Sequence, residues 1–129
     1  MEVLNTDPRQ LSPLNLAFIG DCVYEMQVRC HLVALANRPV NDLHRESVKF
    51  VSAKAQTAAF ARMEPLLTEE ELAVFKRGRN AKTGHQTKSA TVGEYHCATG
   101  VEALFGYLYL TGQTERIEEL FAIIFQEGE

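Results

Sequence analysis

The stretch that decides the fold is residues 13–36, PLNLAFIGDCVYEMQVRCHLVALA. This run is rich in apolar residues, and it follows Ser12, which offers an N-cap directly before a proline at the first helical position. The segment Asn37-Arg38-Pro39 ends the run. The pattern therefore predicts a long first helix from Leu14 to about Ala36.

Caps and prolines divide the rest of the chain into further helices. Two of them open with a capping box, in which a threonine is followed three residues later by a glutamate: Thr68 with Glu71, and Thr91 with Glu94. Residues 78–90 read as a loop, and no sustained period-two alternation or Asn-Gly turn predicts a strand. The expected helices span residues 41–63, 69–77, 92–110 and 115–126, with Asn41 or Asp42 and Thr114 as the other N-caps and Gly112 as a C-terminal stop. The predicted fold class is all-α.

Length and composition limit the class of protein. The chain has 129 residues, enough for one domain, residues 1–129, whose core needs no disulfide or metal. Its formal net charge of −4 argues against a simple basic nucleic-acid-binding segment. The longest run without a charged residue, 103–114, is shorter than the ~18 residues of a membrane helix, and the N-terminus shows no secretory signal. Cys22, Cys30 and Cys97 lack metal-binding spacing and are expected to be reduced core thiols of a cytoplasmic protein.

Two carboxylates occur inside apolar runs. Asp21 lies in the first helix and Glu102 in the 92–110 helix. An unpaired buried charge is too costly to keep, so each acid must be paired, hydrogen-bonded, protonated or metal-bound. Each stands near a glycine, Gly20 or Gly106, and helices that meet at glycines can approach closely enough to bring the two carboxylates together. Mg²⁺ typically takes one or two carboxylates and keeps several waters, so the pair is a candidate magnesium site.

Other interpretations of these acids stay open. Each can be structural, meeting an arginine, a tyrosine hydroxyl or a helix N-terminus, because structural ion pairs also perturb pKa values. Glu25, one turn after Asp21, can join the site or pair with Arg29 four residues on. The sequence shows no phosphate-binding P-loop and no serine-nucleophile motif, and its four histidines lack metal spacing.

A block of positive charge is the second unusual feature. Residues 72–93 contain no Asp or Glu but five of the thirteen Lys and Arg residues. Such a block on a glycine-hinged loop suits contacts with phosphates, and a solvated surface loop is the alternative. The candidate RNA-binding residues are Lys76, Arg77, Arg79, Asn80, Lys82 and Lys88.

Three stretches carry a family likeness. Residues 17–25, AFIGDCVYE, and residues 99–110, TGVEALFGYLYL, contain the two acids, and residues 76–82, KRGRNAK, hold most of the basic block. The first two resemble the signature helix and the second metal-binding helix of the ribonuclease III family. The third resembles the short Mini-ribonuclease III branch, as do residues 41–44 and 51–56. The likeness covers about residues 14–110.

The resemblance implies an all-helical endoribonuclease that forms a homodimer, uses Mg²⁺ and cuts both strands of double-stranded RNA. For the Mini branch it implies trimming of precursor 23S ribosomal RNA. Asp21 matches the family's catalytic aspartate and Glu102 its metal-binding glutamate, and Glu25 and Thr99 are candidates to act around the metal through water.

The sequence also departs from the family pattern. Leu14, Ala17 and Thr99 stand where the family signature has acids, which leaves a non-catalytic double-stranded RNA-binding dimer as the alternative function. The family's usual double-stranded RNA-binding domain has no counterpart in these residues, so the resemblance assigns recognition to the basic block. Phe18, Tyr24 and Phe105 are candidate contributors to the dimer surface.

Overall fold

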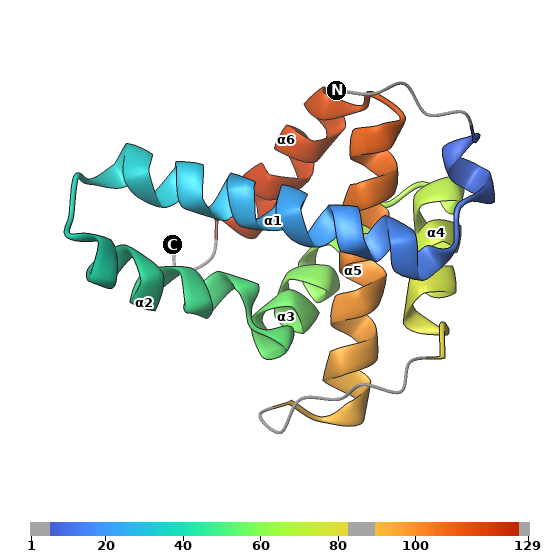
Figure 1. Ribbon diagram of the computed structural model, residues 1–129, viewed down its shortest axis with the longest axis horizontal. Coiled ribbons are helices and arrows are strands. Elements are labelled where there is room, and N and C mark those ends of the chain that lie inside the picture. The colour runs from blue at the N-terminus through green and yellow to red at the C-terminus, as the bar shows by residue number, and fades with distance from the viewer. Residues whose placement is uncertain (1–5, 83–89, 127–129) are drawn as a thin grey trace.

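The computed structural model describes residues 6–82 and 90–126, and this part of the chain is helical, with no strand. The predicted all-α fold class is confirmed. No helix within these residues is long and apolar enough to cross a membrane. Figure 1 shows the order of the elements along the chain. Their bounds are η1 Pro8–Gln10, α1 Pro13–Leu35, α2 Val40–Val51, α3 Ala53–Met63, η2 Glu64–Leu66, α4 Glu69–Arg79, α5 Val92–Leu110 and α6 Thr114–Ile124.

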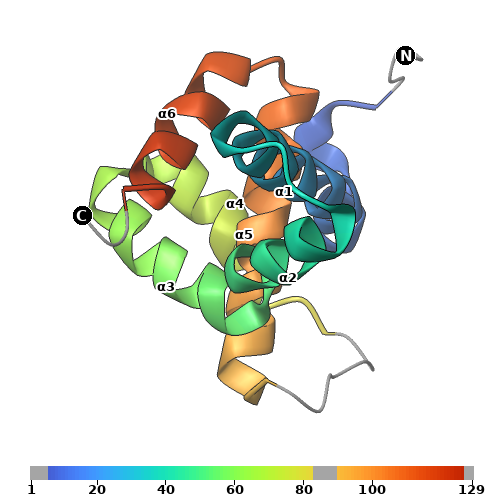
Figure 2. The same cartoon turned by 90° about the vertical axis from the view of Figure 1, so that its left-hand side faces the viewer.

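Helix α5 runs through the middle of the molecule, and α1, α3 and α4 pack around it (Figures 1 and 2). From Ala98 to Leu108 every residue of α5 is buried except Glu102, which is half-buried. A helix that is apolar all round belongs at the centre of a fold. Glu102 is therefore a carboxylate set into an otherwise apolar central helix.

The crossing of α1 and α5 depends on Gly20 and Gly106. A Cβ atom built on Gly20 would lie 1.6 Å from the backbone oxygen of Glu102, and one on Gly106 would lie 1.9 Å from the backbone oxygen of Leu16. Real Cβ atoms essentially never come closer than 3.0 Å to such atoms, so only glycine allows this contact. The predicted close approach of two helices at these glycines is confirmed.

Local sequence signals set several helix ends as predicted. The threonine and glutamate of each capping box bond reciprocally, at 3.1 and 2.9 Å for Thr68 and Glu71 and at 3.0 and 3.1 Å for Thr91 and Glu94. Gly112 adopts a φ of 74° directly after α5 and its C-cap. Glycine tolerates this left-handed conformation, so it stops the helix as expected.

The predicted 41–63 helix is in fact two helices. Ser52 has an extended backbone, with φ −62° and ψ 154°, and its hydroxyl accepts a hydrogen bond from the amide three residues on at 3.2 Å. It therefore caps α3 and separates it from α2. Helix α2 begins after Pro39 without a side-chain cap, so the prediction that Asn41 or Asp42 caps it is wrong.

Two other helix ends differ from the prediction. Helix α4 continues through Gly78 to Arg79, and a Cβ on Gly78 would lie 2.7 Å from the Cβ of Ala103. This glycine allows α4 to pack closely on α5, and the predicted loop hinge at this position is wrong. Thr114 is the first residue of α6 rather than its cap; the N-cap is Gln113, without a side-chain bond.

The cysteines are free thiols in different surroundings. Cys22 and Cys30 are exposed and Cys97 is half-buried, so the expectation of core thiols is wrong for the first two. Each lies two residues after a buried position of α1, Gly20 or Val28, which is about 200° around the helix and therefore on its outer side.

Candidate active site

The carboxyl groups of Asp21 and Glu102 meet where α1 crosses α5. Asp21 is exposed on α1, immediately after Gly20, and Glu102 is half-buried on α5. The two carboxyls are close enough that the charge of Asp21 and hydrogen bonding to it both raise the pKa of Glu102. The glycine contact that removes side chains from between the helices is what allows the two acids to touch.

The environment of Glu102 favours its neutral form. Burial raises the pKa of Glu102 to about 8, and the negative charge of Asp21 and the hydrogen bond to it are the next causes. Gln56 acts in the opposite direction through a hydrogen bond, and Glu25 adds a weaker repulsion. In the metal-free protein Glu102 therefore keeps its proton at neutral pH.

The carboxylates of Asp21 and Glu102 can serve as oxygen ligands for a hard divalent cation that takes few ligands from the protein. A cation between two carboxylates removes the like-charge repulsion that raises the pKa of one of them. Among the described residues, no group of three or more His, Cys, Asp or Glu side chains is placed to hold a metal. A two-carboxylate site suits Mg²⁺, which keeps several waters, better than Zn²⁺, which prefers His and Cys.

A hollow of about 530 Å³ opens beside Glu102. Its walls come from the junction of α2 and α3 and from the first half of α5. They include Lys54, Gln56 and Tyr95, which the sequence-based search missed because no spacing pattern links them to Glu102. The available signal for Lys54 and Gln56 is the family likeness of residues 51–56, which assigns neither of them a role.

Glu25 and Thr99 flank the carboxyl pair but have bonds of their own. Glu25 Oε1 accepts a hydrogen bond from Arg29 Nε at 3.1 Å, so the predicted surface pair forms. Thr99 is buried one turn before Glu102, and its hydroxyl donates to the Tyr95 carbonyl at 3.0 Å. The hydroxyl oxygen keeps lone pairs that can accept a bond from water.

The predicted basic residues lie at the end of α4. Lys76, Arg77 and Arg79 are exposed in its last turn, Lys82 is exposed just after it, and Lys88 lies outside the described residues. Cations in a last turn also interact favourably with the helix dipole, so these charges stabilise α4 as well.

Contacts of this turn fix it against α5 and against the segment before α1. Arg77 donates hydrogen bonds to two backbone carbonyls that precede α1, at 3.4 and 3.1 Å, and Arg79 Nε donates to Asn80 Oδ1 at 3.1 Å. Gly78 packs against Gly100 and the carbonyl of Thr99 on α5. The basic turn therefore lies at the level of α5 that carries Glu102.

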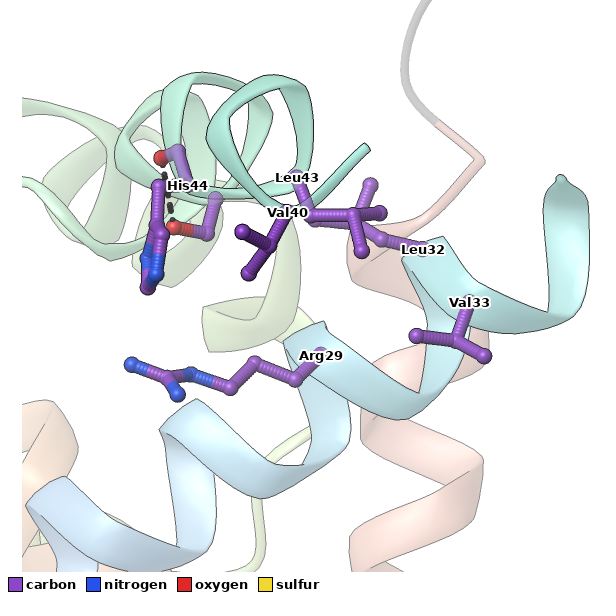
Figure 3. A pocket seen from close by; sticks show the side chains of 7 residues that line it. Arg29, Leu32, Val33, Val40, Leu43 and His44 are labelled. Atoms are coloured by element: carbon purple, nitrogen blue, oxygen red, sulfur yellow. Dashed lines mark hydrogen bonds between the residues drawn. The ribbon is translucent and has the colours of Figure 1, made fainter. Parts of the chain in front are cut away.

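A second hollow, of about 210 Å³, lies between α1 and α2 (Figure 3). It is lined by Arg29, Leu32, Val33, Val40, Leu43, His44 and Ser47. These side chains are mostly apolar, no carboxylate is among them, and Arg29 already pairs with Glu25. This second hollow therefore offers no carboxylate to a metal ion.

Comparison with known proteins identifies the family to which this fold and this pair of acids belong. The model of the ribonuclease III domain matches residues 14–113, which include both acids and the basic turn. The chain belongs to the ribonuclease III family. As a member it is an endoribonuclease, and the fold and enzyme class that the sequence resemblance implied are confirmed.

Relatives place the chain more closely within the ribonuclease III family. It is 50% identical over 116 residues to Mini-ribonuclease 3 of Thermoanaerobacter sp. (strain X514), covering 90% of this chain and 82% of that one. It is 49% identical over 132 residues to Mini-ribonuclease 3 of Brevibacillus brevis, covering 99% and 97%. A crystal structure of a protein from Fusobacterium nucleatum matches with a TM-score of 0.85 at 30% identity, covering 95% and 99%. These names confirm the predicted Mini-ribonuclease III branch.

Proposed function

We propose that this ribonuclease III family member is a Mg²⁺-dependent endonuclease of double-stranded RNA, with Asp21 and Glu102 as its catalytic, metal-holding residues. The observation that carries the proposal is the close pair of carboxyls at the glycine crossing of α1 and α5. The residues that shift the pKa of Glu102 are two acids, Asp21 and Glu25, and one amide, Gln56. None of them is positively charged, so a bound cation would supply the missing countercharge. Residues 1–129 would act as one catalytic domain.

The side chains of the site prepare it for hydrolysis. Glu102 gives up the proton that it holds at neutral pH when a cation binds, so affinity for the cation rises with pH up to about 8. Thr99 offers its hydroxyl oxygen to water beside Glu102. When bound, Mg²⁺ would polarise a phosphate oxygen and lower the pKa of an attacking water.

The end of α4 is the proposed contact surface for the RNA backbone. A-form RNA is recognised mostly by its shape, its 2′-hydroxyls and its phosphates, which exposed cations can contact without base readout. Affinity should fall steeply with salt, because each phosphate contact releases counterions. The proposed contact residues are Lys76, Arg77, Arg79, Asn80, Lys82 and, beyond the described residues, Lys88.

We propose that the protein is a homodimer that uses the outer side of α1. Phe18 is 77% exposed, and Leu14, one turn earlier, is 39% exposed. Exposed apolar side chains that gather in one place mark interaction surfaces. Tyr24 and Phe105, by contrast, lie in the core, so the expectation that they contribute to a dimer surface is wrong.

We propose precursor 23S ribosomal RNA as the natural substrate and the cytoplasm as the place of cleavage. The likeness to the Mini-ribonuclease III branch supports both. Incubating the purified chain with a transcript that spans the mature ends of that RNA tests the assignment: cuts at those ends support it, and cuts spread along every duplex contradict it.

The first experiment is cleavage of double-stranded RNA by the purified chain with Mg²⁺, with EDTA and with the Asp21→Asn variant. Cleavage only by the unmodified protein with Mg²⁺ is the expected result. The alternative is a non-catalytic RNA-binding dimer, which the apolar residues Leu14 and Ala17 favour because they stand where the family signature has acids. Salt-sensitive duplex binding without cleavage under any condition would establish that alternative.

A further inference from the structure

Gln56 is a polar side chain at a core position. It is 2% exposed and stands in line with Ala59 and Met63, the other buried residues of α3. A buried amide is unfavourable by several kcal/mol unless it is hydrogen-bonded, on the order of 2–7 kcal/mol in transfer data. The partner of Gln56 therefore explains why a glutamine is found there.

That partner sets Gln56 apart from the other buried polar residues among the described ones. Ser47 and Thr99 each donate to a carbonyl of their own helix, at 2.8 and 3.0 Å. Glu71 completes the capping box of α4 and accepts hydrogen bonds from Arg116 of α6 at 2.8 and 2.9 Å. Gln56 on α3 instead lines the same hollow as Glu102 on α5, and hydrogen bonding from its side chain lowers the pKa of Glu102.

We propose that Gln56 is a positioning residue, whose amide N–H group holds the Glu102 carboxylate in the orientation that binds Mg²⁺. This inference rests on the proposed metal site. Carboxylates that ligate metals are themselves hydrogen-bonded, and the loss of such a partner lowers metal affinity or activity by about 10–100-fold. An uncharged donor is suited to this place, because a lysine or arginine would pair with the carboxylate and repel the cation.

Burial shows that Gln56 works through Glu102 rather than on RNA. Gln56 lines the same hollow as Lys54, but it is only 2% exposed, whereas Lys54, two residues earlier, is exposed. A phosphate in the hollow therefore finds far more surface on Lys54 than on the Gln56 amide. The effect of Gln56 should therefore appear in metal affinity even when no RNA is present.

The test is the binding of Mn²⁺ to the purified full chain without RNA, measured by the electron paramagnetic resonance signal of free Mn²⁺. Gln56→Met keeps the length of the side chain and removes the amide, and we expect it to raise the dissociation constant by about 10–100-fold. Ser47→Ala is the matched control, because it removes a buried polar group whose bond stays inside α2. It should leave the dissociation constant within about twofold, since it touches neither acid.

A second variant keeps the result decisive. Gln56→Asn retains an amide but is one methylene too short to reach Glu102, so it should weaken Mn²⁺ binding even if Gln56→Met does not fold. Unchanged Mn²⁺ binding by a folded variant at Gln56 would overturn the proposal. Failure of both variants to fold would assign Gln56 to the fold rather than to the ligand, and would overturn it as well.

The proposed metal site can fail separately. If the unmodified chain does not bind Mn²⁺, or if Asp21→Asn binds it equally well, the site itself is wrong. If Asp21→Asn loses binding and Gln56→Met does not, only the role of Gln56 is wrong.

Discussion

Replacing Gly20 by alanine should separate the two helices that form the site. The added Cβ would lie 1.6 Å from the carbonyl oxygen of Glu102, 2.5 Å from its carbonyl carbon and 2.8 Å from the amide nitrogen of Gly106. All three atoms belong to the backbone of α5, so no side-chain rotation relieves the clash. Overpacking of a core typically destabilises by about 1–3 kcal/mol, and this backbone contact places Gly20→Ala at or above ~3 kcal/mol, after about 1 kcal/mol gained from the helix propensity of alanine.

Gly93→Ala is the matched control for this change. Gly93 also lies in a helix, at the second residue of α5, and a Cβ there meets no atom within 4 Å. The control should be neutral or stabilising by about 0.4–1 kcal/mol, because alanine restricts the unfolded chain more than glycine does.

Urea denaturation followed by circular dichroism, at one protein concentration, measures both variants. A loss of ~3 kcal/mol would lower the midpoint by roughly 1–3 M urea, for slopes of about 1–3 kcal/mol per molar. Cleavage of double-stranded RNA should fall together with stability, since Asp21 and Glu102 share that crossing. A Gly20→Ala protein as stable as Gly93→Ala would refute the account of how α1 and α5 meet.

Four further predictions concern charge, packing and partners. Above pH 4.5 the unfolded chain loses the Glu102 proton that the folded, metal-free chain keeps up to about pH 8. Its free energy of unfolding in EDTA should therefore fall by up to about 1.4 kcal/mol per pH unit between pH 5 and 8, a fall that is absent in Glu102→Gln when both are titrated with urea. Arg116→Met removes both hydrogen bonds to the buried carboxylate of Glu71, at 2.8 and 2.9 Å, and should destabilise by about 3 kcal/mol in thermal melts; a loss below ~1 kcal/mol would contradict this. Phe18→Arg should shift the mass measured by light scattering toward the monomer, and an unchanged mass would exclude the outer side of α1 as the dimer surface. Lys76→Ala should weaken duplex binding and reduce the slope of log affinity against log salt by about 1, whereas an unchanged slope would remove Lys76 from the RNA surface.

Local signals predict most of the secondary structure. The two capping boxes and Gly112 act through residues within a few positions, and the structure contains all three as expected. The helix break at Ser52 rests on a local N-cap bond that the helical pattern of residues 41–63 does not reveal, whereas the role of Gly78 depends on packing between helices. Ser52 allows the chain to turn from α2 into α3, and Gly78 takes its meaning from Ala103 on α5 rather than from its own neighbours in the sequence.

Some residues of the candidate site can likewise be predicted from the sequence, and others cannot. Asp21 and Glu102 could be found in the sequence because each is a charge in an apolar run beside a glycine, which predicts both burial and a close helix crossing. Gln56 and Lys54 could not be linked to them, because the approach of α3 to α5 is a long-range contact without a periodic signal.

The site has few acids and one buried amide, Gln56, and both features affect the charge state of Glu102. Glu102 already has a pKa of about 8 with Asp21 and Glu25 as acidic neighbours. Ala17 and Thr99, both 7% exposed, are positions where the sequence resemblance leads us to expect further acids, and a carboxylate at either would have to be buried beside the same pair. Without those acids the metal-free fold contains less repulsion, but a cation finds fewer ligands. Gln56 partly offsets this loss of metal ligands. Its uncharged N–H group favours the ionised, metal-binding form of Glu102 and adds no charge of its own.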